Sequence, residues 1–485
     1  MKRRDLLKKS LLIPFIPAVF SPANILTDRA GSARNIIFYV YDGFSWDDYG
    51  ILRTWMQRRN KDKTAFERLL QSGVSGNMDS SALTSIVTDS AAATTAWATG
   101  RKIVSGSLSW LPDGTELTTI FDLAKSRNKA TGVITTTRVT HATPAGWYAK
   151  IDWRRKEEEI ALQLLGSGTN VILGGGNRVF DASKRSDGLD LYGEFRSRGY
   201  EVANDAHQMD NLNSGNVLGI FSNSHMPYEI DRKHRQLPVP ELSDMVRHGL
   251  RLLSQHENGF VLQVEAGRID HANHANDAAS CLHEMIAADK TLDVLLQFTE
   301  SNPDTLLILA SDHATGGASV YGVGERYRRA SEFFDRIDLP TASFQSMLDD
   351  MESDPRTSTI RSVIQGNHGL RISDRAAEMI RDALNGTYHL SDMQAFGRQP
   401  FNTLAYVLTD PEATYEEPGH LNIKYVSGQH TAAPVPWAAI GPGSEEIPKG
   451  MIDNTAFFGI MARALGVSHE NPVMKPEEAQ ELMTG

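Results

Sequence analysis

The sequence predicts an α/β protein of three layers, with a central, mostly parallel β-sheet between two layers of helices. Three observations support this fold class. Continuous apolar runs of strand length recur along the chain, and amphipathic helical patterns lie between them. The chain has 485 residues, of which 40% are hydrophobic, so it can bury a large core. Alternation of strands and helices is typical of a parallel sheet covered on both faces.

Each predicted strand is an uninterrupted apolar run, not an alternation of apolar and polar residues. That pattern is typical of strands buried on both faces of a sheet. The runs are NIIFYVY (35–41), TGVITT (131–136), NVIL (170–173), GFVLQV (259–264), TLLILA (305–310) and VPWAAI (435–440). Helices are expected between them, for example over 117–126 and 242–255, where apolar residues recur at steps of three and four.

One stretch, from about 319 to 417, departs from this alternation. It has little strand signal, many charges and helical patterns such as 373–384. Proline and glycine are not concentrated in it, which argues against a linker. We therefore expect a helical insertion, or cap, within a single domain that spans 31–485.

The first 30 residues have the plan of a signal peptide. A basic start is followed by a short apolar stretch and then by small residues, and Arg3-Arg4 resembles a twin-arginine signal. The apolar part is too short to span a bilayer. The alternative is a frayed basic terminus of a cytosolic chain. The prediction is a protein of the periplasm or the cell exterior, exported folded, without a stable membrane anchor.

Charge and cysteine content limit the partners and the covalent chemistry. The net charge is −11, and the first 30 residues are basic, so the acidic excess lies in the rest of the chain. Nucleic acid is disfavoured as a partner, because phosphate backbones need basic patches. Cys281 is the only cysteine, which excludes an internal disulfide.

Polar side chains of metal-binding type follow several predicted strands. In an open α/β sheet, ligands gather at the carboxyl ends of the strands. The residues at these positions are Asp42, Glu265, Asp270, His271, His274, Asp312 and His313, and His430 comes shortly before the last predicted strand. Oxygen and nitrogen ligands without cysteine suit zinc, manganese, cobalt or magnesium. Asp270 and His274 would lie on one face of a helix and bind one ion, and a shared carboxylate can bridge two ions.

Each of these residues also has a structural interpretation when taken alone. Asp42 can be a turn residue and Glu265 a strand-end cap. Ser90 begins a run of small residues, SAAATTAWATG, that predicts a tightly packed helix, and it can simply cap that helix. The joint arrival of acids and imidazoles at strand ends favours a functional site.

Six ordered motifs give the chain a specific resemblance. They are TDSAAATTAWATG, VTTTRVTHATPAGWYA, VILGGG, VEAGRIDHANHANDAA, SDHATGG and GQHTAAPVPWAAIGP. Together they resemble the alkaline phosphatase family over about 34–317 and 426–466.

The resemblance implies three ion sites around one nucleophile. Asp270, His274 and His430 would hold one zinc ion, and Asp312, His313 and Asp42 a second. Asp42, Thr143 and Glu265 would hold a third ion, usually magnesium. Ser90 would be the nucleophile, and Arg154, steered by Asp89, would grip the phosphate. Arg155 is the alternative to Arg154 because it is the next residue.

At two positions this sequence differs from some bacterial members of the family. His141 and His271 stand where some bacterial relatives carry Asp and Lys, and both are expected beside the phosphate and the third ion. A nitrogen ligand at His141 would favour zinc or cobalt at the third site.

The predicted function is therefore metal-dependent hydrolysis of small phosphate monoesters through a phosphoserine on Ser90. A phosphodiesterase of the same superfamily is the first alternative, and it should lack the third-site pair Thr143 and Glu265. An exported metal-binding or phosphate-binding protein without turnover is the second. Family members are often dimers, so the resemblance also implies a homodimer.

Overall fold

The structure is a computed structural model, and it describes residues 32–322, 324–387, 400–409 and 421–484. The predicted signal peptide, residues 1–30, lies outside the described residues, as does the end of the predicted insertion, 410–417. Within the described residues, no helix combines the length and the apolar character needed to cross a bilayer.

The centre of the molecule is a ten-stranded sheet. In spatial order its strands are β14 (Gly450–Asp453), β2 (Val74–Asp79), β13 (Val435–Ile440), β8 (Thr305–Ala310), β1 (Asn35–Tyr41), β7 (Phe260–Ala266), β3 (Ala130–Arg138), β4 (Val171–Gly175), β6 (Val217–Ile220) and β5 (Glu201–Ala203). Only β13 runs antiparallel to its neighbours, β2 and β8; the other pairs are parallel. The mostly parallel sheet is thus as predicted.

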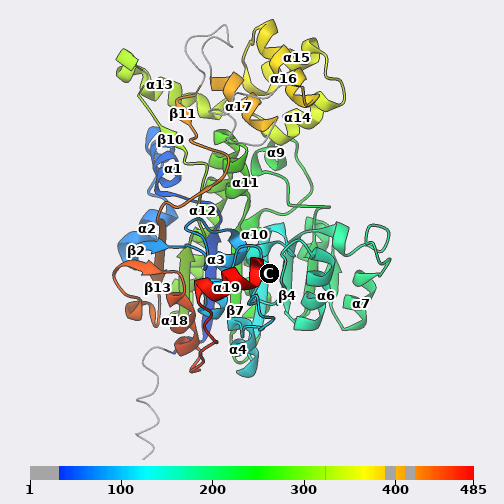
Figure 1. The fold of residues 1–485 in the computed structure, drawn as a ribbon, viewed down its shortest axis with the longest axis vertical. Helices are drawn as coiled ribbons and strands as arrows, with labels where there is room; N and C mark the ends of the chain where they lie inside the picture. The colour runs from blue at the N-terminus through cyan, green and yellow to red at the C-terminus, as the bar shows by residue number, and fades with distance from the viewer. Residues whose placement is uncertain (1–31, 323, 388–399, 410–420, 485) are drawn as a thin grey trace, which may run out of the picture.

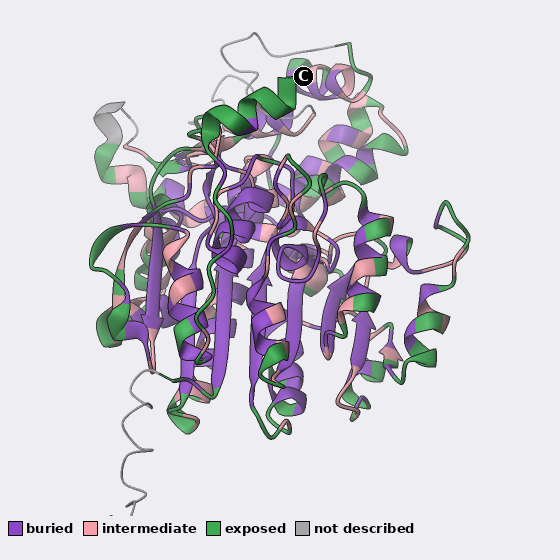
Figure 2. Ribbon diagram, turned by 60° about the horizontal axis from the view of Figure 1, so that its bottom comes forward, coloured by how far each residue is buried: buried purple, intermediate pink, exposed green. Residues whose placement is uncertain are grey.

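Helices cover both faces of this sheet (Figures 1 and 2). They are α1 (Trp46–Arg58), α2 (Ala65–Ser72), α3 (Ser90–Thr99), α4 (Ile120–Ser126), α5 (Ala142–Ala145), α6 (Glu157–Ser167), α7 (Leu191–Ser197), α8 (Ala206–Asp210), α9 (Glu229–His234), α10 (Leu242–Leu253), α11 (Arg268–His274), α12 (Ala278–Ser301), α18 (Ala456–Ala464) and α19 (Pro476–Thr484). The predicted helix over 117–126 begins later, at Ile120, because Thr119 and Asp122 form a capping box there.

Strand β1 shows how two core layers arise from one apolar run. Successive side chains of a strand point to opposite faces. Tyr39 therefore packs into the core beneath α1, α2, α10 and α12, whereas Phe38 packs beside Trp97 of α3, Trp147 and Phe457 of α18. Every residue of β1 is buried, and this confirms the three-layer interpretation.

The insertion forms a separate helical body at one end of the molecule (Figure 1). It contains α14 (Phe344–Glu352), α15 (Thr357–His368), α16 (Asp374–Leu384) and α17 (Phe401–Thr409). Helix α13 (Ala330–Asp335), also in the insertion, lies apart from this body and buries Phe334 in the core of the main domain. Helices α14 to α17 share their own apolar core. Two short antiparallel strands, β10 (Ser319–Val320) and β11 (Ile423–Lys424), pair at its base.

Two buried aspartates of the main domain fix the start of this helical body. Asp231 accepts hydrogen bonds from the backbone N–H of Ser343 at 2.9 Å and from its hydroxyl at 2.6 Å. Asp277 accepts one from the N–H of Phe344 at 2.8 Å. These bonds place the N-terminus of α14 next to α12, directly after the helix α11 that carries Asp270 and His274.

Candidate metal and phosphate site

Three neighbouring central strands position the candidate ligands. β1 lies between β7 and β8, and Val40 pairs with Glu265 on one side and with Ala310 on the other. Asp42 follows β1 directly, and Asp312 follows β8 after one intervening residue. These parallel strands end at the same edge, so their carboxylates meet there.

Gly43 lets the chain turn sharply after β1. Its φ is +72°, and a Cβ atom there would lie 2.7 Å from the Cα atom of Asp270. Its backbone N–H donates to Asp312 Oδ1 at 2.9 Å. A larger residue at position 43 would push the turn after Asp42 away from the segment that carries Asp270.

The first group consists of Asp270, His274 and His430. Nε2 of His274 lies 3.4 Å from Asp270 Oδ1 and 3.1 Å from Nε2 of His430, which is 3.6 Å from the same Asp270 oxygen. The Nδ1 atoms donate to carbonyl oxygens, of Gly428 at 2.7 Å and of Thr88 at 2.9 Å. Both Nε2 atoms therefore present lone pairs to one another and to a carboxylate, which is the arrangement of a cation site.

The second group consists of Asp42, Asp312 and His313, whose ligand atoms all lie within 4.8 Å of one another. The Thr315 hydroxyl donates its proton to Asp270 at 2.7 Å, so at 3.2 Å it accepts from Nδ1 of His313. Nε2 of His313 then faces Asp312 Oδ2 at 3.0 Å as an acceptor. A cation shared by these acceptors would satisfy them together.

The short strands β9 (Ala314–Thr315) and β12 (His430–Thr431) join these two groups. They pair antiparallel, with His430 opposite Thr315. The rings of His313 and His430 stack with their centroids 3.6 Å apart. The pairing thereby brings His430 to the end of β8, although it lies more than a hundred positions after His313 in the sequence.

The third group lies around Asp42 and Glu265. Ligand atoms of Asp42, Glu265 and His141 fall within 4.8 Å of one another, and the Thr143 hydroxyl lies 3.4 Å from Asp42 Oδ2. Thr137 donates to Glu265 Oε2 at 2.9 Å. His141, which is expected from the sequence beside this group and is also considered there as a nitrogen ligand, has a ring nitrogen among these ligand atoms.

Unpaired buried charge shows that these groups fit metal ions. Asp42 Oδ1 and Glu265 Oε1 are buried without a hydrogen-bond partner. Burial, reinforced by the charges of Asp312 and Asp270, raises the pKa of Asp42 well above its ordinary range. Burial also raises the pKa of Glu265. Carboxylates packed in this way remain ionised only beside compensating cations.

Helix α3 presents Ser90 to the second group. Asp89, not Ser90, caps this helix, because its carboxylate accepts the N–H of Ala92 at 3.0 Å. The interpretation of Ser90 as the N-cap is therefore wrong. Its buried hydroxyl oxygen instead lies 3.3 Å from Nε2 of His313. The hydroxyl is left free for chemistry at the positive end of a helix.

The small residues of α3 allow this close packing. All ten residues from Ser90 to Thr99 are buried. The Thr94 hydroxyl donates to the carbonyl oxygen of Thr143 at 2.8 Å, and a Cβ atom on Gly146 would lie 2.4 Å from the Thr94 methyl group. Because these side chains are small, helix α3, which begins at Ser90, packs directly against the segment that carries Thr143 of the third group.

Arg154 contacts residues of the candidate site, whereas Arg155 points to the Trp153 ring. The Nη1 atom of Arg154 donates to Asp89 at 2.9 Å, and Nη2 lies 3.0 Å from Nε2 of His141. Arg155 is exposed, and its guanidinium lies over the ring of Trp153. Geometry therefore favours Arg154 of the two neighbours.

Comparison with known proteins gives the family. The sequence model of the alkaline phosphatase family matches residues 33–467. The chain belongs to the alkaline phosphatase family. The solved structure of Thermus thermophilus alkaline phosphatase superposes with a TM-score of 0.90 at 41% identity, covering 97% of this chain and all of that one.

Curated members of the alkaline phosphatase family agree. Alkaline phosphatase 3 of Bacillus subtilis is 28% identical over 442 residues, which are 89% of each chain. The repressible alkaline phosphatase of Saccharomyces cerevisiae is 32% identical over 337 residues, 63% of this chain. The matched region spans only 59% of the yeast protein's own length.

Sequence reasoning missed part of the alkaline phosphatase site. His225 packs its ring 4.2 Å from that of His271, centroid to centroid, and contacts Arg138. Glu157, buried, accepts from Arg138 at 2.7 Å. Arg268 lies 3.1 Å from Nδ1 of His271. His225 lies five residues after β6, so it is a histidine that follows a strand, as the candidate residues do. It was missed because β6 was not predicted.

Proposed function

We propose that this protein hydrolyses phosphate monoesters through a phosphoserine intermediate on Ser90, with two zinc ions and a third, magnesium-type ion. The single observation that carries the proposal is the position of the Ser90 hydroxyl. It lies 3.3 Å from Nε2 of His313, among the lone pairs of a buried ligand group.

The residues that would hold the ions follow from the three groups. One zinc ion belongs with Asp270, His274 and His430, and the other with Asp42, Asp312 and His313. The third ion belongs with Asp42, Thr143 and Glu265, and the nitrogen of His141 makes zinc or cobalt alternatives there. Bound ions lower the pKa of a nearby hydroxyl and offset charge that develops on phosphoryl oxygens.

The chain's own residues bind and orient the phosphate. Asp89 holds Nη1 of Arg154, so the guanidinium plane is fixed beside Ser90. A fixed guanidinium pairs with two phosphoryl oxygens at once, which lysine does not do. Ser90 attacks phosphorus at the N-terminus of α3, where the helix dipole favours an anion. The bond from Ser90 Oγ to phosphorus forms, the ester P–O bond breaks, and the alcohol leaves with the proton that Ser90 gives up. Water then attacks the phosphorus of the seryl ester, the bond to Ser90 Oγ breaks, and a proton of that water restores the Ser90 hydroxyl as phosphate leaves.

A phosphodiesterase is less well supported than a monoesterase. The group around Glu265 and Thr143 adds a third cation position next to Asp42. A monoester carries one more charged oxygen than a diester, so it profits more from that extra positive charge. A binding protein without turnover would not need the buried Ser90 hydroxyl at His313, next in the chain to the Asp89 that holds Arg154.

Export and assembly complete the proposal. The sequence of residues 1–30 supports delivery of the folded protein to the periplasm or beyond by the twin-arginine route. Family membership supports a homodimer. The helical body of α14 to α17 is proposed to act as a cap that limits the size of substrates.

The test compares two nitrophenyl esters and two serine variants. The zinc-loaded protein should hydrolyse the phosphate monoester far faster than the diester, and a diester preference would favour the alternative. Acid quenching with radiolabelled phosphate should trap a phosphoenzyme in the wild type and in the Ser85→Ala control, because Ser85 is an exposed residue of the same loop. Ser90→Ala should lose it; label on that variant would refute the assignment.

A further inference from the structure

One large aromatic side chain stands exposed beside the phosphate-binding residues. Trp153 directly precedes Arg154, and 45% of its surface is exposed. Trp97, Trp147 and Trp437, by contrast, are fully buried in the core. An exposed indole loses the free energy that burial of its apolar surface would provide. Its exposed position next to Arg154 therefore suggests a role in binding.

The Trp153 ring is fixed to the loop that holds the site. It covers Gly106, where an added Cβ atom would lie 2.2 Å from the ring. The N–H of Gly106 donates to the Asp89 carboxylate at 3.1 Å, and its carbonyl accepts from the backbone N–H of Arg154 at 2.7 Å. The indole is therefore packed on one side against the segment that orients Asp89 and Arg154.

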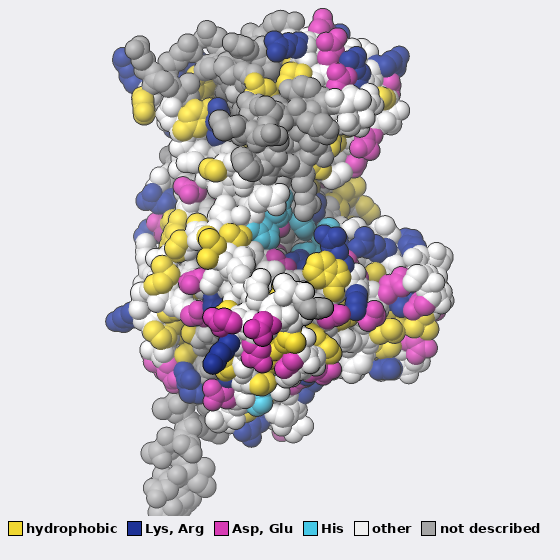
Figure 3. Space-filling view, in the orientation of Figure 1, with side chains coloured by type: hydrophobic (Ala, Val, Ile, Leu, Met, Phe, Trp, Pro, Cys, Tyr) yellow, Lys and Arg dark blue, Asp and Glu magenta, His cyan; other side chains and the backbone are white. Residues whose placement is uncertain are grey.

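A cation lies over the same ring. The guanidinium of Arg155 lies 5.8 Å from the ring centroid of Trp153, and among the described residues it makes no ion pair. Figure 3 shows histidine side chains in a hollow of this face, with Lys and Arg side chains and large hydrophobic groups beside it. A flat ring and a delocalised cation are both surfaces on which aromatic groups stack.

We infer that Trp153 and Arg155 form a platform for the leaving group of the substrate, and that this platform favours planar aromatic groups such as aryl or nucleoside moieties. The inference rests on the proposed function, because it places the ester's alcohol portion next to a phosphate bound by Arg154. A rigid ring pays little conformational entropy when a second ring stacks on it. Alkyl monoesters lack this stacking and gain nothing from it.

The experiment uses phosphonates, which cannot be hydrolysed and so remove differences in leaving-group reactivity. Dissociation constants of phenylphosphonate and ethylphosphonate are measured by calorimetric titration of the zinc-loaded protein. Trp153→Ala should weaken phenylphosphonate about tenfold relative to ethylphosphonate. Trp153→Phe should retain most of the preference. Tyr327→Ala is the matched control, since that exposed ring also covers a glycine, Gly322, but lies in the insertion.

The outcomes separate the two proposals. An unchanged ratio of the two dissociation constants in Trp153→Ala overturns the platform, and so does an equal loss for both ligands, which would indicate a purely structural role. Hydrolysis of phenyl and glycerol phosphates is measured in parallel. Absence of monoester turnover in the wild type would refute the proposed function itself, whatever the phosphonates do.

Discussion

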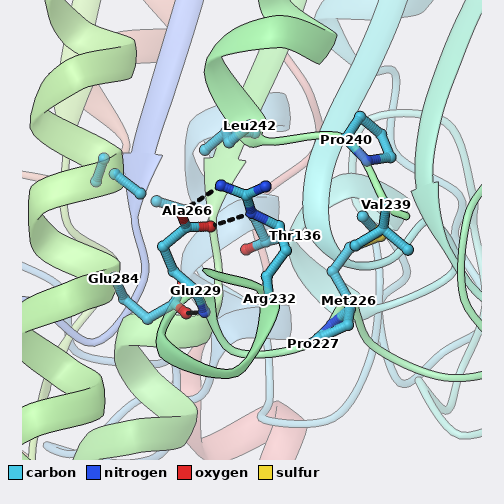
Figure 4. Close-up of a pocket in the computed structure, with 12 residues that line it drawn as sticks. Thr136, Met226, Pro227, Glu229, Arg232, Val239, Pro240, Leu242, Ala266 and Glu284 are labelled. Atoms are coloured by element: carbon cyan, nitrogen blue, oxygen red, sulfur yellow. Dashed lines mark hydrogen bonds and ion pairs between the residues drawn. The ribbon is translucent and has the colours of Figure 1, made fainter. Parts of the chain in front are cut away.

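Replacing Glu284 by Gln should remove a large pH dependence of the protein's stability. Glu284 lies on α12, fully enclosed, and accepts the backbone N–H of Glu229 at 2.6 Å. It borders a cavity of about 20 Å³, water-sized, that Thr136 and Ala266 also line (Figure 4). Burial raises the pKa of Glu284 from 4.5 to about 8.

The sign and size of the effect follow from proton linkage. Between pH 4.5 and 8 the folded state holds a proton that the unfolded state has released. The free energy of unfolding therefore falls as pH rises through this window and is level above it. One pKa unit corresponds to about 1.4 kcal/mol, so the shift amounts to roughly 5 kcal/mol. Gln is neutral at every pH, and its amide oxygen can still accept the N–H of Glu229.

The assay is denaturant unfolding of the zinc-loaded wild type and Glu284→Gln between pH 5 and 9. The variant's advantage should be near zero at pH 5, grow with pH and level off above pH 8. Taking the difference between the two proteins cancels the pH dependence of the metal groups, which both share. Glu159→Gln, an exposed residue, is the control and should show no trend. A constant difference between wild type and Glu284→Gln would refute the reasoning.

Three other predictions concern the site. Arg154→Ala should lower kcat/KM for glycerol phosphate roughly 100-fold, while Arg155→Ala should change it little; equal losses would contradict the assignment. His141→Asp should shift the third ion toward magnesium, as measured by metal content after dialysis against mixed ions; unchanged content would contradict ligation by His141. Gly146→Ala, whose methyl would meet Thr94 at 2.4 Å, should cost about 1–3 kcal/mol in denaturant unfolding.

The six central strands could be predicted, and the two strands at each end of the sheet could not. The six apolar runs correspond to β1, β3, β4, β7, β8 and β13, because a strand covered on both faces must be apolar throughout. β2 reads VSGNMD, and only Met78 in it is buried, so it carries no such signal. The reversed direction of β13 also leaves no trace in local sequence, since it depends on which strands it meets.

The candidate ligands could be predicted because they directly follow recognisable strands or recur at helical spacing. His225 and Arg138 could not, because β6 was not predicted and the predicted strand over 131–136 ends before Arg138, which belongs to β3. The place of His141 among the ligand atoms depends on how α5 packs against α3 and β7, which is a tertiary contact. The role of Asp89 as the N-cap, leaving Ser90 free, likewise required coordinates.

The central claim is that strand-end acids and imidazoles hold closely spaced cations beside the Ser90 hydroxyl. Anomalous X-ray diffraction at the zinc edge, on crystals of the zinc-loaded full chain, tests it most directly. We expect one zinc peak among Asp270, His274 and His430, and a second among Asp42, Asp312 and His313, next to Ser90. Zinc peaks away from both groups, or none at either group, would contradict the account.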